Sequence, residues 1–443
     1  MLLGRKLSAP IPLTDRSGQR LGHLLAFPSH DALAIFDQAV VSATRFFTSI
    51  IVGRMCGPHE LGDYTLGFTI YCIAACVQTG FISQPLTVYG QHLQGDQRRR
   101  YAGSTLVQFA ALGFMVAVLL GLTAGASSLY PNLTNVSPLI GVLAIAVPLA
   151  LVVEYARRFA FARLQVVTAL AVGMTMAGLQ IGGLAVLAGT NQLTASSALG
   201  AMGVGGAIAG FTWLMRSRKE FSFHRGQLQA DAHKNWQFGR WAVASQLFLV
   251  ARASAVLWLL ALLLNDVATG IFAACDTLVK LSGPLLLAAA NVLFPKIARA
   301  SAENNFDEIR RITRRTATIV GCATALLFVL FALAGERALT LIYGASFSSH
   351  GALLTLLALA VVADGLEMVA ANGVLALGHS HAMFVINLVG FVFTLAITAA
   401  LIPRWGLMGA AWGSLLGRCV TAGLMWATFS RRTLGRECHT HVE

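Results

Sequence analysis

At residues 103–126 the chain reads GSTLVQFAALGFMVAVLLGLTAGA, a run of 24 residues without a charged side chain. An α-helix needs about 20 apolar residues to cross the hydrocarbon core of a bilayer. Such a helix satisfies its own backbone polar groups, which an open strand in lipid does not. Residues 103–126 therefore predict a transmembrane helix, and similar runs recur along the chain.

The composition of the whole chain agrees with this. Of its 443 residues, 56% are apolar and 12% are charged, whereas a soluble protein carries about 25% charged residues. The mean hydropathy is +0.70. The seven cysteines contain no Cys-x-x-Cys pair and indicate neither a disulfide scaffold nor a metal site. These values exclude a disordered chain and an ordinary cytosolic enzyme.

We predict an all-α polytopic membrane protein with about twelve transmembrane helices, since each span with its loop takes roughly 35–40 residues. The apolar runs place these spans at 33–53, 64–89, 103–126, 137–156, 166–188, 193–215, 240–264, 268–294, 316–334, 351–377, 382–402 and 407–429.

The basic residues predict the orientation. The two tails and the even-numbered connections hold 25 Lys and Arg residues, whereas the odd-numbered connections hold three. Basic residues concentrate on the cytoplasmic side of membrane proteins. We therefore expect a multi-pass protein of the cytoplasmic (inner) membrane, with residues 1–30 and 431–443 as cytoplasmic tails. The net charge of +13 then needs no nucleic-acid partner.

The longest cytoplasmic connection divides the chain into two similar halves. A linker at 217–239 separates an N-lobe of six spans (31–216) from a C-lobe of six spans (240–430). Gly62 precedes the second predicted span and Gly270 lies at the start of the eighth, 208 residues later. Because each half begins on the same side, the repeat is expected to be parallel, with its axis along the membrane normal.

Glycines recur at helical spacing within several spans. This spacing favours close packing of helix backbones, and it occurs at Gly178 and Gly182, at Gly206 and Gly210, and at Gly409, Gly413 and Gly417.

Seven ionisable residues fall inside predicted spans: Arg45, Arg252, Asp276, Lys280, Asp364, Glu367 and Arg418. A charge at the bilayer centre costs at least about 2.5 kcal/mol, so these side chains should face a cavity or each other. Arg45 and Arg252 have no acidic residue within one helical turn. With Lys280, they are our candidates for cations that line a central cavity and bind an anion, for which phosphate is the first choice.

The three acidic residues of this set have two interpretations each. Asp276 and Lys280 are four residues apart and either neutralise each other or act separately. Asp364 and Glu367 are three residues apart, and form either a proton or sodium site or the counter-charge of Arg418. All three are therefore candidates for ion coupling.

Two further acidic residues near span ends are given structural roles. Glu154 lies one turn before Arg157 and Arg158 and is expected to pair with them. Asp37 is expected to cap the inner edge of the first span.

The sequence lacks the common motifs of catalytic and cofactor-binding sites. It contains no phosphate-binding glycine loop, no zinc-ligand spacing and no nucleophile elbow. We therefore predict no catalytic residue, no cofactor and no metal, and a protein that is not an enzyme.

Three stretches carry a resemblance to a known family. They are DQAVVSATRFF at 37–47, GPHELGDY at 57–64 and IPRWGLMGAAW at 402–412. The first two resemble the opening helices of the polysaccharide transporters, the Wzx-type O-antigen and exopolysaccharide flippases. These belong to the multidrug/oligosaccharidyl-lipid/polysaccharide exporter (MOP) superfamily. The third resembles the start of that family's last helix.

The resemblance implies a flippase that moves a polyprenyl-pyrophosphate-linked oligosaccharide across the membrane, through a cationic cavity between two rocking lobes. Arg45 and Arg252 would be cavity cations. The partners would be the lipid-linked substrate, the bilayer and, for export, polymerase machinery. Two alternatives stay open. One is an ion-coupled multidrug exporter of the same superfamily, and the other is a membrane-embedded glycan polymerase or ligase.

Overall fold

The computed structural model describes residues 30–129, 137–303, 305–377 and 380–434. The predicted tails lie almost wholly outside this part of the chain. Every regular element within it is a helix, which confirms the all-α polytopic fold. The elements are α1 (His30–Gln78), η2 (Thr79–Ser83), α2 (Gln84–Gly90), α3 (Gly95–Ser128), α4 (Ser137–Ala162), α5 (Val166–Gly189), α6 (Ala195–Arg216), η4 (Arg218–Glu220), α7 (Arg225–Leu263), α8 (Asp266–Val279), η5 (Lys280–Ser282), α9 (Gly283–Ala302), α10 (Phe306–Tyr343), η6 (Ala345–Phe347), α11 (Gly351–Ala376) and α12 (Ser380–Leu434).

The two longest elements, α1 and α12, are helical hairpins. In α1 the backbone leaves the helical region at Gly57, where φ is 87°, a value that glycine adopts without strain. The guanidinium of Arg45 then lies 5.3 Å from the centre of the Phe68 ring, whereas 23 residues of straight helix would separate them by about 35 Å. Gly406 has a φ of 55° and turns α12 in the same way.

The hairpins bear on the number of spans. In the described residues, nine segments are long and apolar enough to cross a membrane, and two of these contain the hairpins. The predicted span 268–294 is divided among α8, η5 and α9. The count of twelve stays a prediction.

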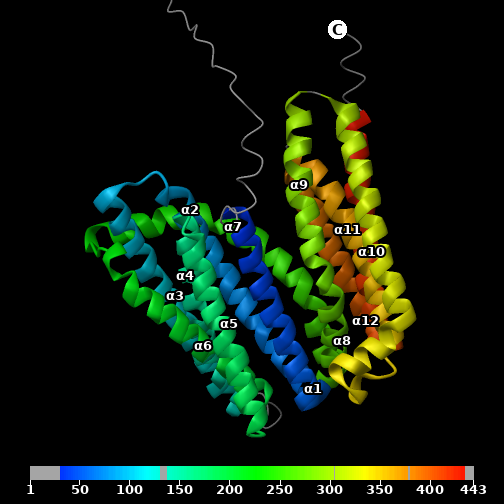
Figure 1. The fold of residues 1–443 in the computed structure, drawn as a ribbon, viewed down its shortest axis with the longest axis horizontal. Coiled ribbons are helices and arrows are strands. Elements are labelled where there is room, and N and C mark those ends of the chain that lie inside the picture. Colours follow the sequence, from blue (N-terminus) through cyan, green and yellow to red (C-terminus); the bar gives the residue numbers. More distant parts are fainter. Residues whose placement is uncertain (1–29, 130–136, 304, 378–379, 435–443) are drawn as a thin grey trace, which may run out of the picture.

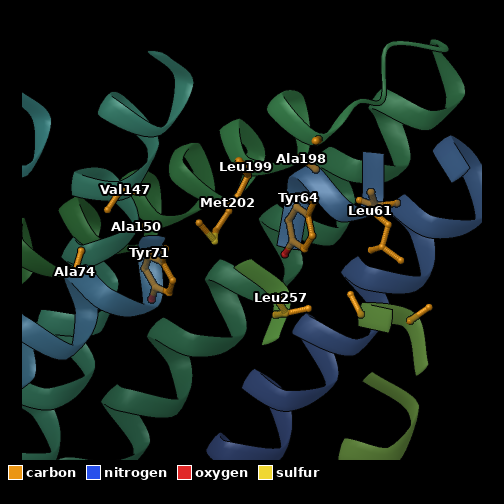
Figure 2. Close-up of a cluster of buried hydrophobic side chains, with 14 of the residues drawn as sticks. Leu61, Tyr64, Tyr71, Ala74, Val147, Ala150, Ala198, Leu199, Met202 and Leu257 are labelled. Carbon is orange, nitrogen blue, oxygen red and sulfur yellow. The ribbon is translucent and has the colours of Figure 1, made fainter. Parts of the chain in front are cut away.

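The helices form two groups. Helices α1 to α6 pack on one another, helices α8 to α12 do the same, and α7 contacts both. Figure 2 shows the core of the first group, where Tyr64 and Tyr71 of α1 meet Val147 of α4 and Met202 of α6. Large apolar side chains point outward, among them Phe114 at 73% exposed. This is the pattern of a protein whose solvent is lipid.

The two groups meet at one end and diverge at the other. In Figure 1 α1 lies beside α8 at the lower end, and the groups separate toward the end where α9 and the end of α12 lie. At the joined end, a Cβ built on Gly270 would lie 1.8 Å from the Pro58 carbonyl oxygen, and one on Gly62 would lie 2.1 Å from that of Asp266. The two glycines that the repeat pairs thus lie in one backbone contact. A two-fold axis between the lobes would produce such a contact, although the repeat itself stays a prediction.

The glycine spacing predicts packing correctly in some helices and wrongly in one. Cβ atoms on Gly206 and Gly210 would lie within 3 Å of α4, which confirms close packing there. Cβ atoms on Gly178 and Gly182 would meet nothing within 4 Å. The prediction for α5 is therefore wrong, because the spacing places these glycines on one face but does not say what that face contacts.

The predicted linker at 217–239 is largely helical. Its first part holds η4, and from Arg225 onward it forms the beginning of α7. Polar residues such as Gln and Lys continue a helix nearly as readily as apolar ones, so the drop in hydropathy that ends the span does not end the helix.

Candidate functional site

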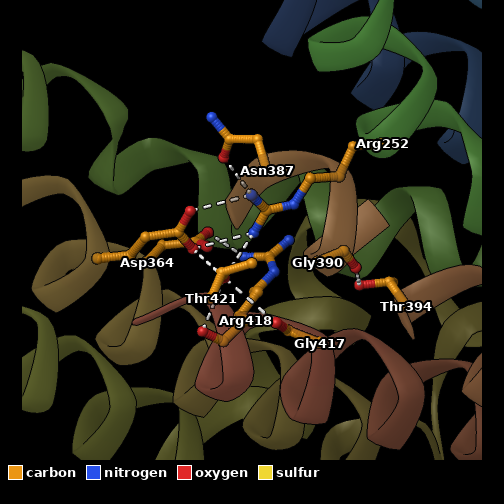
Figure 3. Close-up of polar contacts among 9 residues, drawn as sticks. Arg252, Asp364, Asn387, Gly390, Thr394, Gly417, Arg418 and Thr421 are labelled. Carbon is orange, nitrogen blue, oxygen red and sulfur yellow. Dashed lines mark hydrogen bonds and ion pairs between the residues drawn. The ribbon is translucent and has the colours of Figure 1, made fainter. Parts of the chain in front are cut away.

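Helices α7, α11 and α12 bring together a polar cluster. Arg252 of α7 donates from its two terminal nitrogens to the two carboxylate oxygens of Glu367 in α11, each at 2.9 Å. Thr421 of α12 accepts from Arg252 at 3.1 Å and donates to Glu367 at 2.5 Å. Figure 3 shows Arg252 pointing to this cluster, with the Asn387 amide oxygen at 3.5 Å. Bidentate geometry of this kind makes a strong and directional ion pair.

A second ion pair lies beside the first. Arg418 of α12 binds Asp364 of α11, so the bridge that the sequence offered as one interpretation of Arg418 is confirmed. Since Glu367 is bound by Arg252, each carboxylate of α11 has its own arginine. The arginines come from two different helices.

The close approach of the two halves of α12 positions this cluster. A Cβ on Gly417 would lie 2.0 Å from the Thr394 hydroxyl, and one on Gly413 would lie 2.2 Å from that of Thr398. The glycine spacing at 409–417 is therefore a packing seam. It aligns Arg418 and Thr421, the next polar residues along the helix, with α11.

Arg252, a candidate cavity cation, is ion-paired in the structure, and its role in substrate binding stays a prediction. The sequence has no acidic residue within one turn of it on α7. Its partner lies 115 residues away in sequence, on α11. The packing of helices, which local spacing does not report, supplies the counter-charge.

The third pair confirms another interpretation. Lys280 Nζ lies 2.5 Å from an oxygen of Asp276, so the two residues neutralise each other across one helical turn. The side chain of Lys280 is 65% exposed, whereas that of Asp276 is 15% exposed. Breaking the ion pair of Lys280 to bind another anion should therefore cost less free energy than breaking that of Arg252.

In the first group of helices, Asp37 and Glu154 are both bound by arginines. Arg157 of α4 binds Asp37 and donates to Glu154 at 3.2 Å, and Arg158 donates to Glu154 at 2.7 Å. The structural role of Glu154 is confirmed. The cap predicted for Asp37 is wrong, because its side chain is 1% exposed and turned toward α4. The sequence held one sign of a buried partner for Asp37, namely the adjacent Arg157 and Arg158 at the end of an apolar helix. Adjacent residues of a helix point in different directions, and here Arg157 points inward.

Arg45 differs from all these cations. In the described part of the chain no carboxylate lies within ion-pairing distance of it, and its contact is with the face of the Phe68 ring. It is exposed at the edge of a hollow of about 50 Å³ that is also lined by Glu154 and Gln180. The thiol of Cys72 lies within electrostatic range of both Arg45 and Lys280.

We expect the Arg252–Glu367 pair to be chiefly structural. Replacing either residue by alanine leaves a charge in a largely buried site and should lower the free energy of unfolding by about 3 kcal/mol. The double variant should regain most of this loss. The measurement is thermal unfolding in detergent, with Arg299→Ala as the control, because its ion pair with Glu303 is exposed on both sides and an exposed pair contributes less than about 1 kcal/mol. Losses that simply add in the double variant would contradict the coupling.

The comparisons with known proteins agree with this geometry. A family model described as polysaccharide biosynthesis protein matches residues 38–301. A search of curated proteins finds no match.

Several solved structures share the fold. The inward-facing conformation of a multidrug resistance MATE family transporter of the MOP superfamily is 14% identical, with 91% of this chain and 98% of that chain covered at a TM-score of 0.73. The lipid II flippase MurJ, in an inward closed conformation, is 12% identical, with 89% and 87% covered at a TM-score of 0.72. A MOP superfamily transporter from Pyrococcus furiosus, described as having a binding pocket of reverse polarity, is 14% identical, with 90% and 94% covered at a TM-score of 0.62.

These likenesses establish the fold. The family model includes residues 38–64 and confirms the resemblance there at the level of the family. The family model covers more than half of the 443 residues. The chain therefore belongs to the polysaccharide biosynthesis protein family and has the fold of the MOP superfamily transporters.

Proposed function

We propose that this protein is a flippase that moves a polyprenyl-pyrophosphate-linked oligosaccharide from the cytoplasmic to the outer leaflet of the inner membrane. It would do so by alternating access and without making or breaking a covalent bond. The observation that carries the proposal is Arg45, a cation within the membrane whose charge no described carboxylate neutralises at ion-pair distance.

The charges around Arg45 favour an anionic substrate. Asp37 and Glu154 are occupied by Arg157 and Arg158, so the local excess of charge is positive. On the other group of helices, Lys280 has a side chain that is 65% exposed. The guanidinium of Arg45 and the ammonium of Lys280 would together bind a pyrophosphate that passes between the two groups of helices, because a pyrophosphate offers several strong acceptor oxygens. Arg252 would hold α7 against α11 through its ion pair with Glu367.

The conformation of the lobes supports translocation. The groups are joined at the Gly62–Gly270 contact and diverge toward the end at which α12 finishes. With both termini in the cytoplasm, as the basic residues predict, this is a state open to the cytoplasmic leaflet. Rocking of the two lobes about a central site would then open the opposite side.

The test is deletion of the gene, followed by assays of lipid-linked oligosaccharides and of surface polysaccharide. We expect complete lipid-linked units to accumulate on the cytoplasmic side while the surface polymer is lost. Reintroducing the gene should restore both. Unchanged surface glycan would overturn the proposal.

The likeness to multidrug transporters favours one competing function. An ion-coupled drug exporter would give a deletion strain that is sensitive to drugs and retains its glycan. Because exported drugs are mostly cations, the positive surroundings of Arg45 disfavour this reading. A glycan polymerase would instead form bonds between sugars when purified and placed in liposomes.

A further inference from the structure

A hollow on the second group of helices lies outside the site described above. It has a volume of about 570 Å³ and lies where α10, α11 and α12 meet. None of its described lining residues is acidic, and those that matter here are Arg310, Arg314 and Thr318 of α10, Leu366 of α11, and Trp426 and Ser430 of α12. We call it the α10–α12 hollow.

Two arginines give the α10–α12 hollow a positive charge. Arg310 is half-buried and donates to the Thr433 carbonyl oxygen at 3.2 Å, so it is held between α10 and the end of α12. Arg310 also forms an ion pair with Asp307 at 3.6 Å. Arg314 lies one turn further along the same face and is exposed. No described carboxylate forms an ion pair with it.

The depth of the α10–α12 hollow places it at a membrane interface. Arg310 and Arg314 lie in the early turns of α10 and Ser430 lies in the last turns of α12, at the end where the lobes diverge. Trp426 donates its indole N–H to the Leu366 carbonyl oxygen at 3.0 Å. Tryptophan and arginine are typical of the level of the lipid headgroups. In the orientation that the basic residues predict, this level belongs to the cytoplasmic leaflet.

The surface below the hollow is apolar and has room for an acyl chain. On the same face of α12 as Ser430, successive turns toward the bilayer interior present Gly423, Cys419 and Leu416, all of them exposed. A Cβ on Gly423 would meet nothing within 4 Å. The face therefore combines a cationic site at headgroup depth with an uncharged, exposed helix surface that continues from it.

We infer that the α10–α12 hollow binds the phosphate headgroup of an anionic diacyl phospholipid of the cytoplasmic leaflet, with an acyl chain along α12. Basic pockets between transmembrane helices on this side hold anionic lipid headgroups. The positive lining selects an anionic lipid over a zwitterionic one, and the uncharged surface of α12 beside it selects a lipid over free phosphate. The bound lipid would join α10 to α12 and stabilise the second group of helices.

The test is a titration of the purified full-length protein in neutral detergent with phosphatidylglycerol, followed by native mass spectrometry and thermal unfolding. Each arginine near the headgroup should contribute about fivefold in affinity. We expect Arg314→Gln to weaken binding about fivefold and the double variant R310Q/R314Q to weaken it further. Phosphatidylcholine should bind poorly to every variant.

A matched control is available on the same helix. R311Q/R315Q removes the same charge at the same depth, but from other faces of α10. This variant should bind phosphatidylglycerol as the unchanged protein does. Equal losses in both double variants would overturn the inference, because they would show a diffuse surface charge. So would unchanged binding in Arg314→Gln, which keeps the Arg310 contact with α12 intact. A polyprenyl pyrophosphate that binds through Arg310 and Arg314 while phosphatidylglycerol does not would also overturn it.

Discussion

Replacing Arg45 by alanine is expected to lower the export of lipid-linked oligosaccharide at least about tenfold, while the protein still folds and inserts. A charge-assisted hydrogen bond to phosphate contributes about 1.5–3 kcal/mol, which corresponds to a factor of ten or more. Arg45 contacts a ring face and no described carboxylate, so its loss leaves no buried acid without a partner. The measurement is the amount of surface polysaccharide in a deletion strain that expresses the variant.

Two control variants separate charge from folding. Arg45→Lys keeps the positive charge and should retain part of the activity, although it lacks the planar guanidinium. Arg311→Ala removes an exposed arginine from α10 and should leave export unchanged. Normal surface glycan in the Arg45→Ala strain, at equal protein levels, would contradict a role of Arg45 in substrate binding.

The second large effect is expected at the joined end of the lobes. A valine at Gly270 would place its Cβ 1.8 Å from the Pro58 carbonyl oxygen, a backbone atom that cannot rotate away. Helices α1 and α8 would then have to separate, and the conformation that is closed at this end would be lost. Since alternating access needs both closed states, we expect Gly270→Val to abolish export.

The separation of α1 from α8 can be measured directly. Ser49 is buried and lies 3.1 Å from the Tyr343 hydroxyl and 3.4 Å from that of Thr277. In a chain whose native cysteines are replaced, Ser49→Cys should be protected from a membrane-impermeant maleimide. Adding Gly270→Val should expose it. Gly178→Val is the matched control, because a Cβ at Gly178 meets nothing within 4 Å. Protection that persists in Gly270→Val would contradict the proposed role of this contact.

The site could be predicted from the sequence only in part. The pairing of Asp276 with Lys280, and of Glu154 with its neighbouring arginines, follows from residues one helical turn apart. These predictions are confirmed. The partners of Arg252 and Asp37 lie 115 and 120 residues away. No local pattern contains them, so the pairing of Arg252 could not be predicted, and Asp37 was wrongly expected to be a cap.

The sequence by itself determined that this protein is a bundle of apolar helices in a membrane. Hydropathy and helical length are properties of single segments, and a bilayer imposes the same demand on every segment that crosses it. Only the tertiary structure shows which distant charges are paired and which glycine faces meet another helix. Those outcomes depend on which faces of distant helices meet. This is why Gly270 contacts α1 whereas Gly178 contacts nothing, and why Arg252 is bound to Glu367 whereas Arg45 has no ion pair in the described structure.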